Sequence, residues 1–307
     1  MRPIDPCQYE PAAVKVFLQL PVRKSGRVQA PFMAGESLRT WGSVMSNWMV
    51  SGGFAVIFLL ASTALFFFVV TRGTLLVRGL SAGQNSEKSH VYPIYSSMRL
   101  IKLVDFQPVI SAILLFQYHR LVSKIVTGLE QTDLRGKKVL ITSCAFGNVI
   151  PRVVDAALQS GAERVLIADI IQNELVHARG KLRRHCAKVE FIEDNATAMR
   201  QTDGVAAANV MFFLLHELPH DLKQRALSEA GRMLAPGGKL YLAEFHRPEP
   251  WVLRALSWTY FKVFEPFGLA LWDTHDPLNW LESRGGWSCE RSTYLFGNFQ
   301  VITATKK

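Results

Sequence analysis

Two acidic residues stand at the ends of predicted β-strands, where their carboxylates could bind a nucleoside. Asp169 ends the strand 164–169 in Val-Leu-Ile-Ala-Asp, and Asp194 follows the strand 188–193. The carboxyl ends of parallel strands meet at one edge of a sheet, and ligands of such sheets bind there. A carboxylate at the position of Asp169 can accept hydrogen bonds from both hydroxyl groups of a ribose. The sequence therefore predicts a site for an adenosine-containing ligand at this edge.

These residues belong to a region in which strands and helices alternate, from about residue 133 to the end of the chain. This alternation predicts an α/β fold, a mostly parallel doubly wound sheet closed by an antiparallel final strand pair. The helix 221–234 is expected to stop at Pro236-Gly-Gly, and 251–267 is expected to be mostly helical. The expected strands are 139–144, 164–169, 188–193, 207–215, 239–245, 289–294 and 299–304, and the expected helices between them include 149–160 and 172–185.

The loop after the first strand, Ser143-Cys-Ala-Phe-Gly, is poorer in glycine than its surroundings predict. The region resembles the class I S-adenosylmethionine (SAM) methyltransferases, which carry an acidic residue and then Gly-x-Gly-x-Gly here. In this chain Ile141 stands at the acidic position, and Ser143, Ala145 and Gly147 stand at the glycine positions. The segment Leu234-Ala-Pro-Gly-Gly-Lys-Leu also resembles these enzymes, which share such a helix end and strand start. The loop indicates either altered chemistry on SAM or a dead cofactor site.

The resemblance implies a Rossmann-like class I methyltransferase fold with SAM as cofactor. The residues expected to bind SAM are Ser143, Cys144, Gly147, Asp169 and Asp194, with Asp194 beside the adenine. Retention of both strand-end acids favours altered chemistry over a dead site. Loss of a carboxylate at position 141 would lower the pKa of the SAM amine and so enlarge its neutral, nucleophilic fraction. We expect Ile141→Asp to depress transfer of that amine.

Further segments resemble enzymes of quinone biosynthesis. Leu242-Ala-Glu-Phe-His-Arg-Pro is similar to the ubiquinone/menaquinone C-methyltransferases. Phe212-Phe-Leu-Leu-His-Glu-Leu-Pro and Phe264-Glu-Pro-Phe-Gly-Leu-Ala-Leu-Trp resemble the RquA family of rhodoquinone biosynthesis. That resemblance implies conversion of ubiquinone to rhodoquinone, in which an amino group from SAM replaces a ring methoxy group and manganese assists. The alternatives are a SAM-dependent methyltransferase acting on a quinone or other lipid, and a non-catalytic membrane protein with a degenerate domain.

The candidate catalytic residues are His216, Glu217, His246 and Arg247, all in loops that follow strands at the expected ligand edge. A divalent ion would prefer Glu217 or Glu244 with a neighbouring histidine, but the residues single out no ligand set. His216-Glu-Leu-Pro-His spells the zinc-protease motif, which requires both histidines on one helix. Pro219 disfavours such a helix, so we expect no zinc site.

The N-terminal third predicts attachment to a membrane. Residues 53–70 carry no charge, and we expect a transmembrane helix over 48–71 after a polar, basic tail or targeting segment, 1–47. Residues 72–132 are expected to form a linker and a helical lid or interfacial region, with 106–122 interrupted by Pro108, and 133–307 the SAM-binding domain. Basic residues after the span place that domain on the cytoplasmic side of a bacterial membrane or the matrix side of the mitochondrial inner membrane. The net charge of +10 suits an anionic membrane, and no aromatic-and-basic RNA motif accompanies it.

Overall fold

The computed structural model describes Tyr95 and residues 98–307, except the side chains of 263 and 264. The predicted tail, the transmembrane helix 48–71 and most of the predicted linker lie outside the described residues. Within them, no single helix is long and apolar enough to cross a membrane. The helices α4 (Gln107–Ile113) and α5 (Tyr118–Glu130) would suffice together by length and composition, but a bend of 98° separates them.

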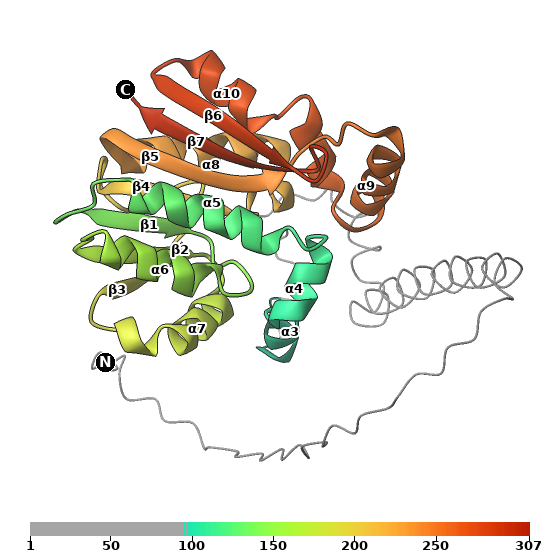
Figure 1. The fold of residues 1–307 in the computed structure, drawn as a ribbon. Coiled ribbons are helices and arrows are strands. Elements are labelled where there is room, and N and C mark those ends of the chain that lie inside the picture. Colours follow the sequence, from blue (N-terminus) through green and yellow to red (C-terminus); the bar gives the residue numbers. More distant parts are fainter. Residues whose placement is uncertain (1–94, 96–97) are drawn as a thin grey trace, which may run out of the picture. The chain divides into compact units, whose positions relative to one another are not determined.

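The centre of the fold is a seven-stranded sheet in the order β3-β2-β1-β4-β5-β7-β6 (Figure 1). The first five strands pair in parallel, and β7 is antiparallel to both β5 and β6. The prediction of a mostly parallel sheet with an antiparallel final pair is therefore confirmed. The strands are β1 Lys138–Thr142, β2 Arg164–Asp169, β3 Val189–Glu193, β4 Ala206–Phe212, β5 Leu234–Phe245, β6 Trp287–Tyr294 and β7 Phe299–Lys306.

Helices cover both faces of the sheet, because the apolar strands must be buried on both sides. On one face α5, α6 and α7 share a core cluster with side chains of β1, β2 and β4. On the other face α8 and α10 pack against β4, β5 and β7. The bounds of these and the other helices are α3 Met98–Val104, α6 Val149–Gln159, α7 Gln172–Lys181, α8 His220–Met233, α9 Trp251–Phe264 and α10 Pro277–Arg284. Short 3₁₀ helices are η2 Arg183–His185, η3 Leu215–Glu217 and η4 Pro266–Trp272.

The expected interruption at Pro108 is wrong. Pro108 does not interrupt a helix, since it lies in the first turn of α4, where its missing amide hydrogen is not needed. The break comes at Leu115 and Phe116, which adopt φ values of +48° and +59°. The helix predicted over 221–234 is found as α8, which ends at Met233, three residues before Pro236. That prediction is therefore confirmed to within one residue, and Pro236-Gly-Gly already belongs to β5.

Two further differences lie in loops near the sheet edge. The predicted strand 207–215 ends at Phe212, and η3 follows it. The helix α10 was not expected from the pattern, although it begins with a recognisable signal. Asp276 accepts a hydrogen bond from the backbone N–H of Asn279 at 3.1 Å, and Pro277 occupies the first helical position. This arrangement is a typical helix start.

Candidate functional site

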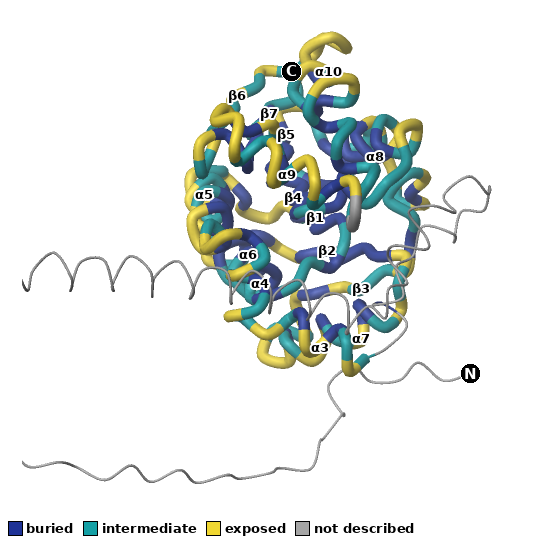
Figure 2. The backbone as a smooth tube through the Cα atoms, turned by 90° about the vertical axis from the view of Figure 1, so that its right-hand side faces the viewer, coloured by how far each residue is buried: buried dark blue, intermediate teal, exposed yellow. Residues whose placement is uncertain are grey.

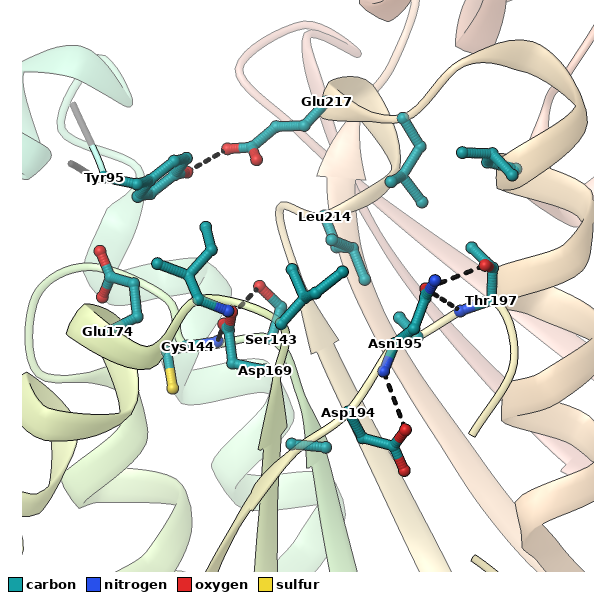
Figure 3. Close-up of a pocket in the computed structure, with 16 residues that line it drawn as sticks. Tyr95, Ser143, Cys144, Asp169, Glu174, Asp194, Asn195, Thr197, Leu214 and Glu217 are labelled. Carbon is teal, nitrogen blue, oxygen red and sulfur yellow. Dashed lines mark hydrogen bonds between the residues drawn. The ribbon is translucent and has the colours of Figure 1, made fainter. Parts of the chain in front are cut away.

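A pocket lies at the carboxyl edge of the parallel strands, at the predicted position (Figure 3). Its volume is about 840 Å³ with open solvent included, which suits a small-molecule ligand. The lining comes from the loop after β1, the end of β2, the turn after β3 and the segment around η3. Of the nine residues predicted to bind or act, those that line it are Ser143, Cys144, Asp169, Asp194 and Glu217.

Asp169 joins the first loop to the end of β2. Its Oδ2 accepts a hydrogen bond from the backbone N–H of Cys144 at 2.5 Å and one from the Ser143 hydroxyl at 3.4 Å. Its Oδ1 accepts from the N–H of Ile171 at 2.7 Å. Burial raises the pKa of Asp169 to about 6, although these hydrogen bonds act in the opposite direction. A carboxylate has about four lone-pair sites, so it can still accept from a ligand hydroxyl.

At Ser143 the first loop keeps a backbone conformation that favours glycine, although the residue is serine. Ser143 stands where the common pattern has glycine and adopts φ +76°, a conformation that costs a non-glycine residue about 1–2 kcal/mol. Hydrogen bonds from Ser143 N to Ala168 O and from its hydroxyl to Asp169 hold it there. Ile141 is buried in the core and does not line the pocket. The residue at the family's acidic position is thus part of the packing below the site.

Gly147 is needed for packing and does not line the pocket. Its φ is +78°, and a Cβ atom there would lie 2.5 Å from the hydroxyl oxygen of Tyr118. Its N–H donates to Asp105 Oδ1 at 2.9 Å, and its carbonyl accepts from the Lys181 ammonium at 2.9 Å. Lys181 and Asp105 also form an ion pair at 2.6 Å. These contacts connect the first loop to α7 and to the segment between α3 and α4.

Asp194 is buried in the turn after β3, and backbone N–H groups of this turn donate hydrogen bonds to its carboxylate. Asp194 Oδ1 accepts from Asn195 N at 3.0 Å, and Oδ2 accepts from Arg200 N at 2.9 Å. The Arg200 guanidinium contacts Oδ1 at 3.3 Å. Asp194 therefore shapes the turn, and it lines the pocket together with the three residues that follow it.

Sequence reasoning missed Glu174, a buried carboxylate in the wall of the pocket. Among the residues that the structure describes, its Oε1 has no hydrogen-bond partner. Burial, together with the charge of Asp169, raises the pKa of Glu174 from 4.5 to about 8. Its position was a usable signal: it lies in the first turn of α7, five residues after the strand-end acid. An acid at a helix start has an ordinary electrostatic explanation, which is why it did not stand out.

Glu217 lines the pocket and contacts Tyr95, a second residue that sequence reasoning missed. The Tyr95 hydroxyl donates to Glu217 Oε1 at 2.5 Å, and Figure 3 shows the pair at the opposite end of the pocket from Asp194. Removal from water raises the pKa of Glu217 to about 7, although the positive charge of His216 acts against this. A carboxyl group with a pKa near neutrality can take up or release a proton at physiological pH.

The buried carboxylate of Glu244 holds the segment that carries Glu217. It accepts from the backbone N–H of Leu215 at 2.9 Å and of His216 at 3.2 Å. Lys223, also buried, donates to the carbonyl of Leu215 at 2.7 Å and to that of Leu218. Buried charges are retained when they are hydrogen-bonded in this way. The result is a fixed turn that directs Glu217 into the pocket.

His216 does not line the pocket and is buried against Glu244. Its Nδ1 lies 3.0 Å from Glu244 Oε1. Burial opposes protonation of this ring, but the Glu244 carboxylate outweighs it and raises the pKa of His216 to about 9. His216 belongs to η3, and His220 begins α8 beyond Pro219. The two histidines do not share a helix, as the position of Pro219 between them predicts.

His246 and Arg247 also lie outside the pocket lining. His246 Nδ1 lies 2.7 Å from the carbonyl oxygen of Gly297, and its Nε2 lies 3.1 Å from the Arg291 guanidinium. Burial lowers the pKa of His246, so it is neutral with Nδ1 as the donor. Arg247 is exposed and pairs with Asp273 at 2.8 Å. Of the four predicted catalytic residues, the pocket contains only Glu217.

Carboxyl groups dominate the polar lining of the pocket. Four carboxyl groups line it, and the lining residues that the structure describes include no lysine, arginine or histidine. Within the described ranges, no group of three or more His, Cys, Asp or Glu side chains is placed to hold a metal ion. A ligand that carries positive charge and hydroxyl donors would complement this wall.

Comparisons with known proteins agree with this architecture. The chain is 30% identical over 142 residues to a ubiquinone/menaquinone biosynthesis C-methyltransferase of Cronobacter sakazakii, covering 46% of this chain and 55% of that protein. It is 27% identical over 179 residues to the Salmonella arizonae protein of the same description, covering 56% and 68%. The chain thus spans about half to two thirds of the length of these relatives.

In fold, the chain is similar to a possible exported protein from Bordetella parapertussis, with a TM-score of 0.53 and 13% identity, covering 80% of this chain and 96% of that one. Residues 85–285, more than half of the chain, match the model of the ubiE/COQ5 methyltransferase family. The chain therefore belongs to the ubiE/COQ5 methyltransferase family.

Proposed function

We propose that this protein uses SAM to modify the ring of a lipid quinone, and that the modification converts ubiquinone to rhodoquinone by replacing a methoxy group with an amino group. Membership of the ubiE/COQ5 family and the similarity to proteins named for ubiquinone and menaquinone biosynthesis support the quinone and SAM. The resemblance to the RquA family and the altered first loop support transfer of the amino group.

The pocket residues fit SAM in charge and in hydrogen bonding. SAM carries a sulfonium and an ammonium group, and the wall offers the partnerless Oε1 of buried Glu174. Asp169 would bind the ribose, and the turn Asn195–Thr197 after β3 would contact the adenine. When bound, SAM supplies the group that is transferred to the ring.

The observation that carries the proposal is the Glu217 carboxyl group, which has a pKa of about 7 and a fixed position. Replacement of the methoxy group forms a ring C–N bond and releases methanol, and a free amino group results once the bond between that nitrogen and the SAM α-carbon is broken. Formation of the C–N bond requires loss of a proton from nitrogen, and a base with a pKa near the working pH removes it best. Glu217 would accept that proton while the Tyr95 hydroxyl orients its carboxylate.

This role replaces the electrostatic explanation based on Ile141. The pocket keeps acids at Asp169, Asp194 and Glu217, so loss of a carboxylate at position 141 does not leave the site without negative charge. An Ile141→Asp variant would place its carboxylate in the core, where it would destabilise the fold as well as alter the site. Glu217 is therefore the sharper position to test.

A second candidate function is methyl transfer to a carbon of the quinone ring, which the family membership favours. It would use the same pocket, with Glu217 taking the proton that leaves the substrate. Manganese enters either proposal only through the RquA resemblance, and the step assigned to Glu217 does not involve it.

Product analysis separates the candidates. The purified full chain is incubated with ubiquinone and SAM labelled with ¹⁵N in the amino group and ¹³C in the methyl group. We expect a ¹⁵N-containing aminoquinone that has lost one methoxy group. A second incubation replaces ubiquinone with a prenylated quinol that has one unsubstituted ring carbon, because the ring of ubiquinone has no hydrogen that a methyl group could replace. A ¹³C-methylated product from this quinol, with no ¹⁵N product from ubiquinone, would refute amino transfer and support the second candidate. No product from either substrate would refute both.

Two variants test the role of Glu217. Glu217→Gln should lower kcat by about a hundredfold or more, because it removes the proton acceptor but keeps the shape. The matched control Glu163→Gln changes an exposed acid outside the pocket and should leave kcat unaltered. Equal rates for both variants would refute the assignment of the base.

A further inference from the structure

The end of the molecule that carries α9 presents large apolar side chains to solvent. Trp251 is 77% exposed, and Leu256 and Trp258 are also exposed on the same helix. Figure 2 looks onto this end, with α9 facing the viewer as a largely exposed element. Single exposed apolar residues are ordinary on protein surfaces, but a group of them indicates an interaction site.

Two turns add further apolar side chains. Phe116, between α4 and α5, is 72% exposed, and Phe296, between β6 and β7, is 68% exposed. Each follows another apolar residue, Leu115 or Leu295, and all four adopt positive φ, from +47° to +59°. Such turns usually contain glycine or asparagine. A bulky apolar residue in such a turn strains the backbone and exposes apolar surface to water, and both effects cost free energy.

Contacts connect these elements into one region. The carbonyl of Phe296 accepts a hydrogen bond from Glu249 N at 2.9 Å, directly before α9. The Arg120 guanidinium, in the first turn of α5, lies 5.8 Å from the ring centroid of Tyr294 in β6. The β6–β7 turn therefore lies between the start of α5 and the start of α9. We define the apolar rim as Leu115, Phe116, Trp251, Leu256, Trp258 and Phe296.

The charges around the apolar rim are mostly positive. The helix α9 contains Arg254 and Lys262 but no acidic residue, and Lys262 Nζ lies 5.5 Å from the Trp258 ring centroid. His119 and Arg120 are exposed beside the α4–α5 turn. Glu249 is the exposed acid at the start of α9. Tryptophan and phenylalanine beside lysine and arginine are typical of helices that lie in the interface of an anionic membrane.

We propose that the apolar rim inserts into the surface of an anionic lipid bilayer. Trp251, Trp258 and Phe116 enter the boundary between head groups and acyl chains, and Arg120 and Lys262 contact lipid phosphates. The rim lies beyond the pocket lining and uses none of the residues assigned to SAM. Membrane docking is thus independent of the proposed function, although it would bring the pocket close to a lipid quinone.

A local probe tests this docking in the full chain. Phe116→Cys, Trp258→Cys and the control Val176→Cys, an exposed apolar position on α7, are each labelled with the environment-sensitive fluorophore NBD. The unsubstituted chain, treated in the same way, gives the background from native thiols. Because the probe reports only its own surroundings, membrane binding by other parts of the chain does not mimic the result.

We expect vesicles of phosphatidylcholine with phosphatidylglycerol to shift NBD emission to shorter wavelength at 116 and 258 but not at 176. Vesicles of phosphatidylcholine alone, or high salt, should weaken the shift. No shift at 116 and 258, or an equal shift at 176, would overturn the proposal. A shift that depends on protein concentration without vesicles would overturn it in favour of a second copy of the chain. No outcome depends on turnover, so the result stands apart from the test of the proposed function.

Discussion

The buried carboxyl of Glu174 should make the stability of this protein depend on pH in a definite direction. Its pKa of about 8 lies above the ordinary value of 4.5, so the folded state holds its proton longer than the unfolded chain does as pH rises. Stability from this group is therefore fully present below pH 4.5 and is lost as pH rises to about 8. The contribution of this group to the free energy of unfolding falls by about 1.4 kcal/mol per pH unit across that window, in total by about 5 kcal/mol.

The perturbation is Glu174→Gln, which keeps the shape of the side chain but cannot ionise. At pH 5 the variant and the wild type should have similar free energies of unfolding, because the native carboxyl is protonated there. At pH 9 the variant should be more stable by a few kcal/mol, a large fraction of the ~5–15 kcal/mol of a typical domain. Asp169 and Glu217, with pKa values of about 6 and 7, should retain a smaller pH slope in the variant.

Urea unfolding followed by tryptophan fluorescence, at several pH values between 5 and 9, measures these free energies. Glu163→Gln serves as the control, since its exposed carboxylate should give a profile parallel to that of the wild type. Identical pH slopes for Glu174→Gln and the wild type would refute the reasoning. So would a variant that is less stable at pH 9, because the buried carboxyl would then be stabilising when ionised.

Two further substitutions test the packing of the loop and the assignment of site residues. Gly147→Ala should cost about 2–4 kcal/mol, since its Cβ would meet the Tyr118 hydroxyl at 2.5 Å and its φ is positive. Gly136→Ala has a similar φ but open space and should cost only about 1–2 kcal/mol, so equal losses of unfolding free energy would contradict the packing argument. Arg247→Ala removes an exposed pair with Asp273 and should change stability by less than about 0.5 kcal/mol and leave kcat as it was. A large fall in kcat would restore Arg247 as a site residue.

Much of the fold is predictable from the sequence because the strands are short apolar runs with clear ends. The strand of residues 164–169 is found with the expected bounds, and that of 188–193 differs by one residue. Residues 213–217 could not be predicted as a turn. The backbone N–H groups of Leu215 and His216 donate to the carboxylate of Glu244, which lies 29 and 28 residues further along the chain. A contact between residues so far apart leaves no local sequence pattern.

The candidate site was only partly predictable for the same reason. Asp169 and Glu217 follow strands directly, and the topology of parallel strands places them at the ligand edge. His246 also follows a strand, but its ring is held by Gly297 and Arg291, which approach from β6 and the turn after it. Tyr95 enters the site from before the sheet begins, and nothing in the spacing of its neighbours indicates that contact.

The hydrogen bonds from the first loop to the segment before the sheet have a consequence for engineering. Gly147 N donates to the side chain of Asp105, and Asn148 N donates to that of Gln107. Two backbone amides of the loop are thus hydrogen-bonded to side chains about 40 residues earlier in the chain. The loop and the α3–α4 junction therefore form one structural unit, which has to be exchanged as a whole. If Gly-x-Gly-x-Gly were introduced at positions 143–147 alone, Asp105 and Gln107 would still be placed to bind the amides of the present loop. A functional exchange with an ordinary methyltransferase would have to carry both segments together.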